Sequence, residues 1–148
     1  MMKFSFDTPP GWIETPFPPP QRGIYLHAPP GGLRGALLLM DAITAQGSLE
    51  DQVAGALATG TAGTELLGRS DAIPFTTVAQ LRGLSIVARV GVTHGDRTRE
   101  EIRVFSLVDA GAIRLPIVFI GDVGSPEAFQ REIGLVLYTI RPDTPTPA

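Results

Sequence analysis

The 148-residue chain contains no cysteine, a single lysine and two histidines. Without cysteine there are no disulfides, iron–sulfur clusters, zinc–cysteine sites or cysteine nucleophiles. The lysine, Lys3, follows no glycine-rich loop, so neither a Walker A phosphate site nor a Schiff-base lysine is expected. Two histidines are too few for most metal or acid–base centres, and we predict no metal, no cofactor and no catalytic residue. The chain therefore has little of the chemistry that enzymes use.

Charge and hydropathy argue against two classes of partner. The formal net charge is −3 and the pI is about 5.3, which does not suit a nucleic-acid-binding surface. The longest apolar run, Ala36–Met40, is far shorter than the roughly 18 residues that indicate a membrane span. The first eleven residues hold one lysine and broken hydrophobicity, so no secretory signal is expected. We therefore expect a cytoplasmic protein with neither nucleic acid nor membrane as its partner.

The length and the turn residues predict one globular domain. Single domains cluster at about 100–150 residues, and we place a single α+β domain over residues 1–141. Glycine and proline number 17 and 14, which is typical of a globular chain with many turns. The proline-rich residues 142–148 are predicted to be a disordered tail, because they can neither continue a helix nor bury apolar surface.

Alternating apolar and polar residues predict strands in the second half of the chain. Leu84–Thr93 has one apolar face, and a second face with Ser85 and Arg89 that we expect to be wet. Thr98–Val108 also alternates, but its last residues are apolar on both faces. That end of the strand is therefore expected to be covered on both sides.

A further strand, Ala112–Gly121, follows the hairpin signal Asp109-Ala110-Gly111. It contains Pro116, which has no backbone N–H, so we predict a sheet edge or a bulge there. An upstream strand over Thr76–Leu81 is predicted to join the Leu84 strand through a tight turn at Arg82-Gly83. The remaining predicted strands are Lys3–Phe6, Gly23–His27 and Gly35–Ile43.

Two segments have the helical period. In the first, Ser48 and Asp51 have the spacing of a capping box, and Gly60 supplies a C-terminal stop. The second begins at Ser125-Pro126 and carries a continuous apolar stripe until Pro142 ends it. This order predicts an α+β fold: an antiparallel β-sheet of about six to seven strands, with a meander in its second half, flanked by two main helices.

These elements resemble the PsbP-like superfamily. The motifs that carry the resemblance are Phe4-x-Phe6 leading into Pro9-x-Gly11-Trp12, the strand meander, and a final helix over Phe129–Arg141. The superfamily includes the extrinsic photosystem II subunit, a yeast Ran-binding nuclear import factor and bacterial DcrB-like proteins. The resemblance implies an α/β/α sandwich that binds macromolecules rather than catalysing a reaction. The closest functional analogy is to bacterial members that act as chaperones for secretion effectors.

The two histidines each have a functional and a structural interpretation. His94 precedes Gly95 and Asp96, which would suit an acid–base pair, but the pattern favours an exposed hairpin tip. His27 would suit a ligand at a loop mouth, but a strand end without a partner is favoured.

Charged residues alternate in sign at the start of the Thr98–Val108 strand. They would form a recognition stripe, although a solvated strand face is the favoured alternative, because exposed pairs contribute only about 0–1 kcal/mol each. The residues are Asp96, Arg97, Arg99, Glu100, Glu101 and Arg103.

The segment Trp12–Tyr25 is the strongest candidate for binding. Its residues Trp12, Phe17, Arg22 and Tyr25 flank a run of three prolines, and Trp, Tyr and Arg are enriched in interface hot spots. A proline-rich loop also loses little conformational entropy when it is ordered. The alternative is that Trp12 only plugs the end of the sheet.

From these features we predict a non-catalytic protein-binding or adaptor domain, a chaperone-like or accessory factor in bacteria. Its partner is another protein, and it is a monomer or a homodimer. The rival hypothesis is a small-molecule carrier or an enzyme that uses an apolar pocket on the sheet. A third is an oligomer that pairs through the Pro116 strand if that strand lies at an edge.

Overall fold

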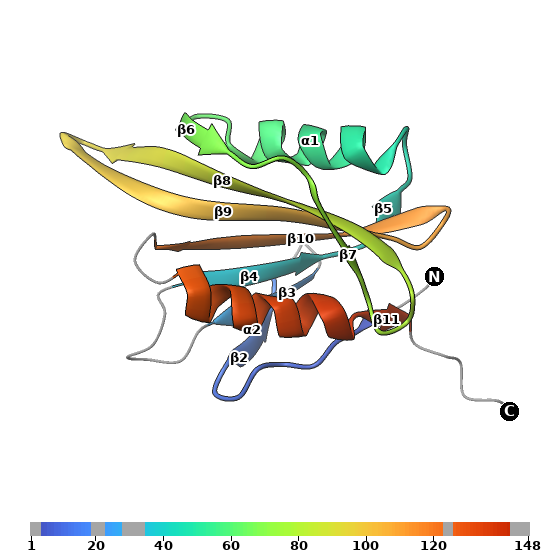
Figure 1. The fold of residues 1–148 in the computed structure, drawn as a ribbon. Coiled ribbons are helices and arrows are strands. Elements are labelled where there is room, and N and C mark those ends of the chain that lie inside the picture. Colours follow the sequence, from blue (N-terminus) through green and yellow to red (C-terminus); the bar gives the residue numbers. More distant parts are fainter. Residues whose placement is uncertain (1–3, 19–22, 28–34, 123–125, 143–148) are drawn as a thin grey trace, which may run out of the picture.

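Nine strands form one antiparallel sheet in the computed structural model, which describes residues 4–18, 23–27, 35–122 and 126–142 (Figure 1). The strand order is β2-β3-β4-β10-β9-β8-β6, with β5 paired to β10 and β7 paired to β8. The strands of this sheet are β2 (Ile13–Pro16), β3 (Gly23–His27), β4 (Gly35–Met40), β5 (Ile43–Thr44), β6 (Glu65–Arg69), β7 (Ile73–Thr76), β8 (Arg82–His94), β9 (Arg97–Asp109) and β10 (Ile113–Asp122). A separate pair joins β1 (Phe4–Ser5) to β11 (Arg141–Pro142).

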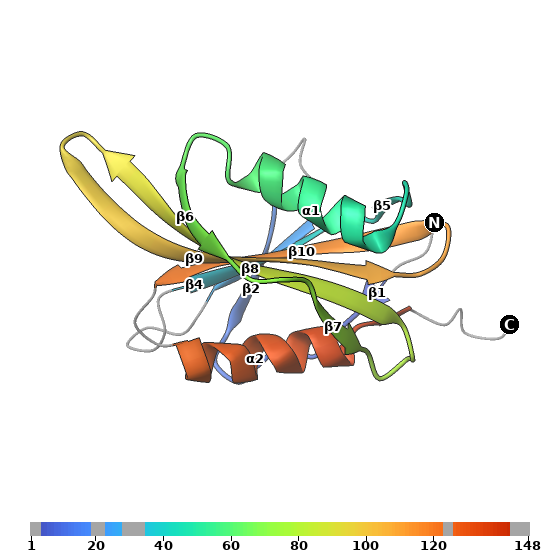
Figure 2. The same cartoon turned by 45° about the horizontal axis from the view of Figure 1, so that its top comes forward.

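Two helices cover opposite faces of the sheet (Figures 1 and 2). α1 (Leu49–Gly60) buries Leu49, Val53 and Leu57 against β8 and β9. α2 (Pro126–Thr139) lies on the other side, where its buried residues share a second core with apolar residues of β3, β4, β9 and β10. The predicted α+β class is confirmed, and the layers are those of an α/β/α sandwich.

The start and the end of α1 lie where the local sequence signals predict them. The helix begins after Ser48, whose hydroxyl accepts a hydrogen bond from the Asp51 N–H at 3.0 Å. Gly60 is the last helical residue, and a Cβ there would overlap the ring of Phe105 on β9. A glycine at this end therefore also allows the helix to approach the sheet closely.

The turn between β7 and β8 lies elsewhere than predicted. β7 ends at Thr76, and a turn follows in which the Thr77 N–H donates to the Leu81 carbonyl at 2.9 Å. Gln80 has a φ of 65° in this turn, a conformation that usually calls for glycine, so the sequence carries no turn signal here. The predicted strand Thr76–Leu81 is therefore wrong. Gly83 lies within β8, where a Cβ would overlap the ring of Phe75.

Pro116 lies in the interior of the sheet, so of the two alternatives predicted for it, a sheet edge or a bulge, the edge is wrong. β10 pairs with β9 on one side and with β4 and β5 on the other. On the second side the pairing to β5 ends at Arg114 and the pairing to β4 begins at Ile117. The residue without an N–H thus coincides with a break in the ladder. Because β10 has neighbours on both sides, it cannot pair two copies, and the oligomer hypothesis built on this strand is overturned.

The sequence predicts the burial of the two faces correctly for β9 but not for β8. At the end of β9, Val104 and Val108 lie in the α2-side core and Phe105 lies in the α1-side core, so cover on both sides is confirmed. The predicted wet face of β8 is wrong at Ser85, which is buried and pairs with Ser106.

The C-terminal end of the described chain returns to its start. Pro142, predicted to begin the tail, pairs with Phe4, and the neighbouring Arg141 pairs with Ser5. Residues 143–148 of the predicted tail lie outside the described residues, as do Lys3 and Ser125.

Candidate binding surfaces

α1 covers only about half of the sheet face on which it packs. The helix packs on β8 and β9, whereas β2, β3, β4 and β10 continue the same face without a described helix over them. Residues directly opposite one another in an antiparallel pair share a face. The register aligns Tyr25 with Leu38, and it aligns Ile13, His27 and Ile120 in a second row through β4.

We call Ile13, Tyr25, His27, Leu38 and Ile120 the open face. Ile13 is 57% exposed and His27 is exposed, while the other three side chains are half-buried. The residues that alternate with them along β3 and β4 point to the opposite side, into the core that they share with α2, where Leu26, Leu37 and Leu39 are buried and Ile24 is half-buried. Strand alternation thus divides the apolar residues between a closed core and an accessible surface.

Aromatic contacts order one end of the open face. The ring centroids of Tyr25 and His27 lie 4.2 Å apart, and Phe17 meets Tyr25 edge-on at 6.1 Å. The Phe17 N–H donates to the Gly23 carbonyl at 3.1 Å and so closes the connection between β2 and β3. These contacts hold a row of flat side chains in defined positions, which lowers the entropy lost when a partner binds.

The structure divides the four residues predicted to bind a partner. Tyr25 belongs to the open face, and Phe17 lies against it. Trp12 is 8% exposed and belongs to the core under α2, where its Nε1 has no hydrogen-bond partner among the described residues. Arg22 lies outside the described residues.

The two histidines lie in different surroundings. His27 belongs to the open face, and His94 is exposed at the end of β8, next to the tight turn at Gly95. Within the described residues, neither histidine forms an ion pair with a carboxylate, and no three potential ligands cluster to hold a metal ion.

The charged stripe on β9 is only partly solvated. Glu101 is 8% exposed and accepts hydrogen bonds from Arg99 at 2.8 Å and from Arg103 at 3.2 Å. Arg103 also donates to the Gly60 carbonyl at 2.7 Å, which satisfies an orphan acceptor at the end of α1. The part of the stripe nearest α1 therefore closes the helix end and does not present charge to a partner.

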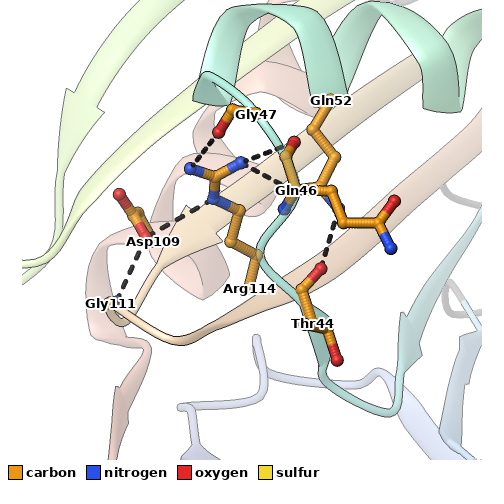
Figure 3. A network of polar contacts seen from close by, with 7 residues as sticks. All are labelled: Thr44, Gln46, Gly47, Gln52, Asp109, Gly111 and Arg114. Atoms are coloured by element: carbon orange, nitrogen blue, oxygen red, sulfur yellow. Dashed lines mark hydrogen bonds and ion pairs between the residues drawn. The ribbon is translucent and has the colours of Figure 1, made fainter.

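Arg114 forms a polar network that sequence reasoning missed (Figure 3). Its side chain is buried on β10, and its Nη1 donates to Gln52 Oε1 at 2.6 Å. Nη2 donates to the Gly47 carbonyl at 3.1 Å, and Nε approaches Asp109 Oδ1 at 3.5 Å. The only signal was a lone arginine in an otherwise apolar strand. Through these contacts the guanidinium anchors the segment that enters α1.

A cavity of about 460 Å³ lies on the other side of the sheet, between α2 and strands β7 to β10. Neither histidine lines it. The described residues that line it are Ile73, Phe75, Thr76, Ser85, Val87, Ile102, Val104, Phe119, Asp122, Ile133, Gly134, Leu137 and Tyr138.

The fold is an antiparallel α+β sandwich, as the sequence predicted. No protein-family model matches the sequence, and no curated protein matches it. Among solved structures, it is similar to LpqN, a Mycobacterium tuberculosis protein involved in cell envelope biogenesis, with a TM-score of 0.57, 9% identity and coverage of 97% of this chain and 85% of that one.

Two further structures share the fold. The Saccharomyces cerevisiae Ran-binding protein Mog1p is similar with a TM-score of 0.52, 11% identity and coverage of 95% of both chains. A Bacteroides thetaiotaomicron protein is similar with a TM-score of 0.53, 13% identity and coverage of 95% of this chain and 45% of that one. Identities this low establish the shared fold alone.

Within the described residues, no helix is long and apolar enough to cross a membrane.

Proposed function

We propose that this chain is a non-catalytic binding protein, an accessory or chaperone-like factor that holds another protein on the open face. The observation that carries the proposal is the half of the sheet that α1 leaves uncovered. A contiguous set of exposed or half-exposed apolar and aromatic side chains is typical of an interaction site on a globular protein.

The chemistry of the open face supports a protein as the partner. Tyr25 presents a large, rigid ring, and aromatic residues are enriched in the buried parts of interfaces. Leu38 and Ile120 add an apolar floor, on which a partner side chain would lose its contact with water. Arg22 and Trp12 stay predictions: the first is not described, and the second would act from the core by supporting the strands.

Two comparisons agree with this role. Mog1p is a Ran-binding protein and LpqN is involved in cell envelope biogenesis, so at least one protein of similar fold binds another protein. The cytoplasmic location and the choice between monomer and homodimer stay predictions from the sequence.

The proposal is tested by capturing a partner from a lysate of the source cells with the purified protein and with two matched variants. Ile13→Glu places a charge on the open face, whereas Leu66→Glu places the same charge on β6, at the opposite edge of the sheet, where Leu66 is 45% exposed. We expect wild type and Leu66→Glu to capture the same protein and Ile13→Glu to lose it at least tenfold. Equal capture by all three, or equal loss with both variants, would contradict the proposal.

A further inference from the structure

The cavity under α2 has walls that are almost entirely apolar. Strands β7 to β10 supply one wall, and α2 supplies the other through Ile133, Leu137 and Tyr138. At about 460 Å³ the cavity falls within the range of roughly 300–1,000 Å³ that small-molecule sites occupy. The dominant interaction with any occupant is therefore burial of apolar surface.

The few polar groups in the walls define which charge an occupant can carry. Ser85 Oγ lies 2.7 Å from Ser106 Oγ, so this hydroxyl is satisfied within the protein. Asp122 is the only charged residue among the described residues that line the cavity. It lies two positions after Ile120 on β10 and pairs with Glu101, so its side chain points to the face of the sheet opposite to the cavity. None of the described lining residues therefore directs a charged side chain into the cavity, which disfavours the burial of either an anionic or a cationic group there.

The mouth of the cavity is apolar as well. Ile73 on β7 and Tyr138 on α2 line the cavity and are 48% and 56% exposed. The turn after β7 is tied to the end of α2, because the Val78 N–H donates to the Tyr138 carbonyl at 2.7 Å. Large apolar side chains that stay exposed around an opening are the expected surroundings of an apolar ligand.

Gly134 points to the same conclusion from the helix side. It lies in the interior of α2, where glycine weakens a helix relative to alanine. A Cβ built at this position meets no heavy atom within 4 Å, so close packing does not require glycine here. The residue lines the cavity, and its missing side chain leaves that space open to an occupant.

We propose that this cavity binds a small amphiphilic molecule with an apolar body and an uncharged head. The body fills the space between α2 and the sheet, and the head lies at the mouth, where Tyr138 is exposed. This site lies on the face of the sheet opposite to the open face. The proposed ligand site therefore goes beyond the proposed function, and an experiment that contradicts one of the two proposals does not contradict the other.

Three ten-carbon probes that differ only in the head test the proposal by calorimetry at pH 8, at concentrations below the solubility limit of 1-decanol and below the micellar concentrations of decylammonium and decanoate. We expect saturable binding of 1-decanol with one site per chain, and at least tenfold weaker binding of decylammonium and of decanoate. Absence of saturable binding, or binding of either charged probe as tight as that of 1-decanol, would overturn the proposal.

Matched glycine variants locate the site. Gly134→Leu fills the cavity and is expected to weaken decanol binding at least tenfold. Gly55→Leu makes the same change inside α1, where a Cβ also meets nothing within 4 Å, and is expected to leave binding unchanged. Equal effects of the two substitutions would overturn the location.

Methyl NMR of the unmodified protein gives a second readout that needs no variant. Decanol is expected to shift the methyl signals of Ile102 and Ile133, which line the cavity, and to leave that of Ile43 on β5 unchanged. Shifts at Ile43 without shifts at the two lining residues would overturn the assignment.

Discussion

Arg114 and Gln52 are joined by a hydrogen bond of 2.6 Å from Nη1 to Oε1, which ties an interior strand to the first half of α1 (Figure 3). Gln52 in turn donates from Nε2 to the Thr44 carbonyl at 3.1 Å. The two side chains thereby fix the segment between β5 and α1. This segment leads the helix onto β8 and β9 and leaves the open face without a described helix over it.

Arg114→Ala is expected to destabilise the protein by about 2–3 kcal/mol, because a buried guanidinium and its charge-assisted hydrogen bonds to Gln52 and Gly47 are lost together. Urea unfolding measures the loss. Arg82→Ala is the control: Arg82 also bonds to α1, through Glu50, but both side chains are more than half exposed, and less than about 1 kcal/mol is expected. Equal losses in the two variants would contradict the role given to Arg114.

Ser48→Ala is expected to lower the free energy of unfolding by about 1 kcal/mol, because the Asp51 N–H at the start of α1 loses its acceptor. The midpoint of urea unfolding reports the change. Ser48→Asp keeps an acceptor at this position and is expected to retain the stability of the wild type. If the alanine variant unfolds at the same urea concentration as the wild type, the cap does not contribute.

Ser85 and Ser106 are expected to be energetically coupled across β8 and β9, since their hydroxyls pair at 2.7 Å in a buried place. Replacing either serine by alanine leaves the other hydroxyl unsatisfied, at a cost of about 1–3 kcal/mol. The double alanine variant is expected to cost less than the sum of the two single variants by about 1 kcal/mol. Strict additivity in this double-mutant cycle would show that the pair does not interact.

The pKa of Glu50 is expected to lie below its usual range, chiefly because its own backbone N–H donates to the carboxylate, with a smaller contribution from the Arg82 guanidinium. A pKa that is lower in the folded state stabilises the fold above the unfolded pKa, and this contribution is lost as the pH falls through the folded pKa. An NMR titration measures it. In Arg82→Ala the pKa should rise only in part, and a full return to the ordinary value would assign the shift to Arg82 instead.

Local patterns made much of the fold predictable. The Ser48 cap and the apolar stripe that follows it depend on neighbouring residues, and α1 begins where they predict. The β8–β9 hairpin is equally local, because Gly95 supplies the positive φ that its turn needs. These elements are determined within a few residues, so a single sequence is sufficient to identify them.

Features determined by distant residues were not predictable. The partners of Arg114 at the entry to α1 lie 62 to 68 positions away in the sequence, and the short strand β6 forms only because β8 offers it an edge. The candidate site also depends on distant residues. Strand alternation places Phe17 and Tyr25 in one row. The open face, however, stays uncovered only because α1 packs on β8 and β9, and no local sequence pattern predicts where this helix packs.

The most direct test of the central claim is site-specific photocrosslinking in the source cells. A photoreactive phenylalanine analogue is placed at Tyr25 on the open face and, in a second sample, at Leu66 on β6. We predict one discrete protein adduct from position 25 and none from position 66. No adduct from position 25, or the same adduct from both positions, would contradict the account.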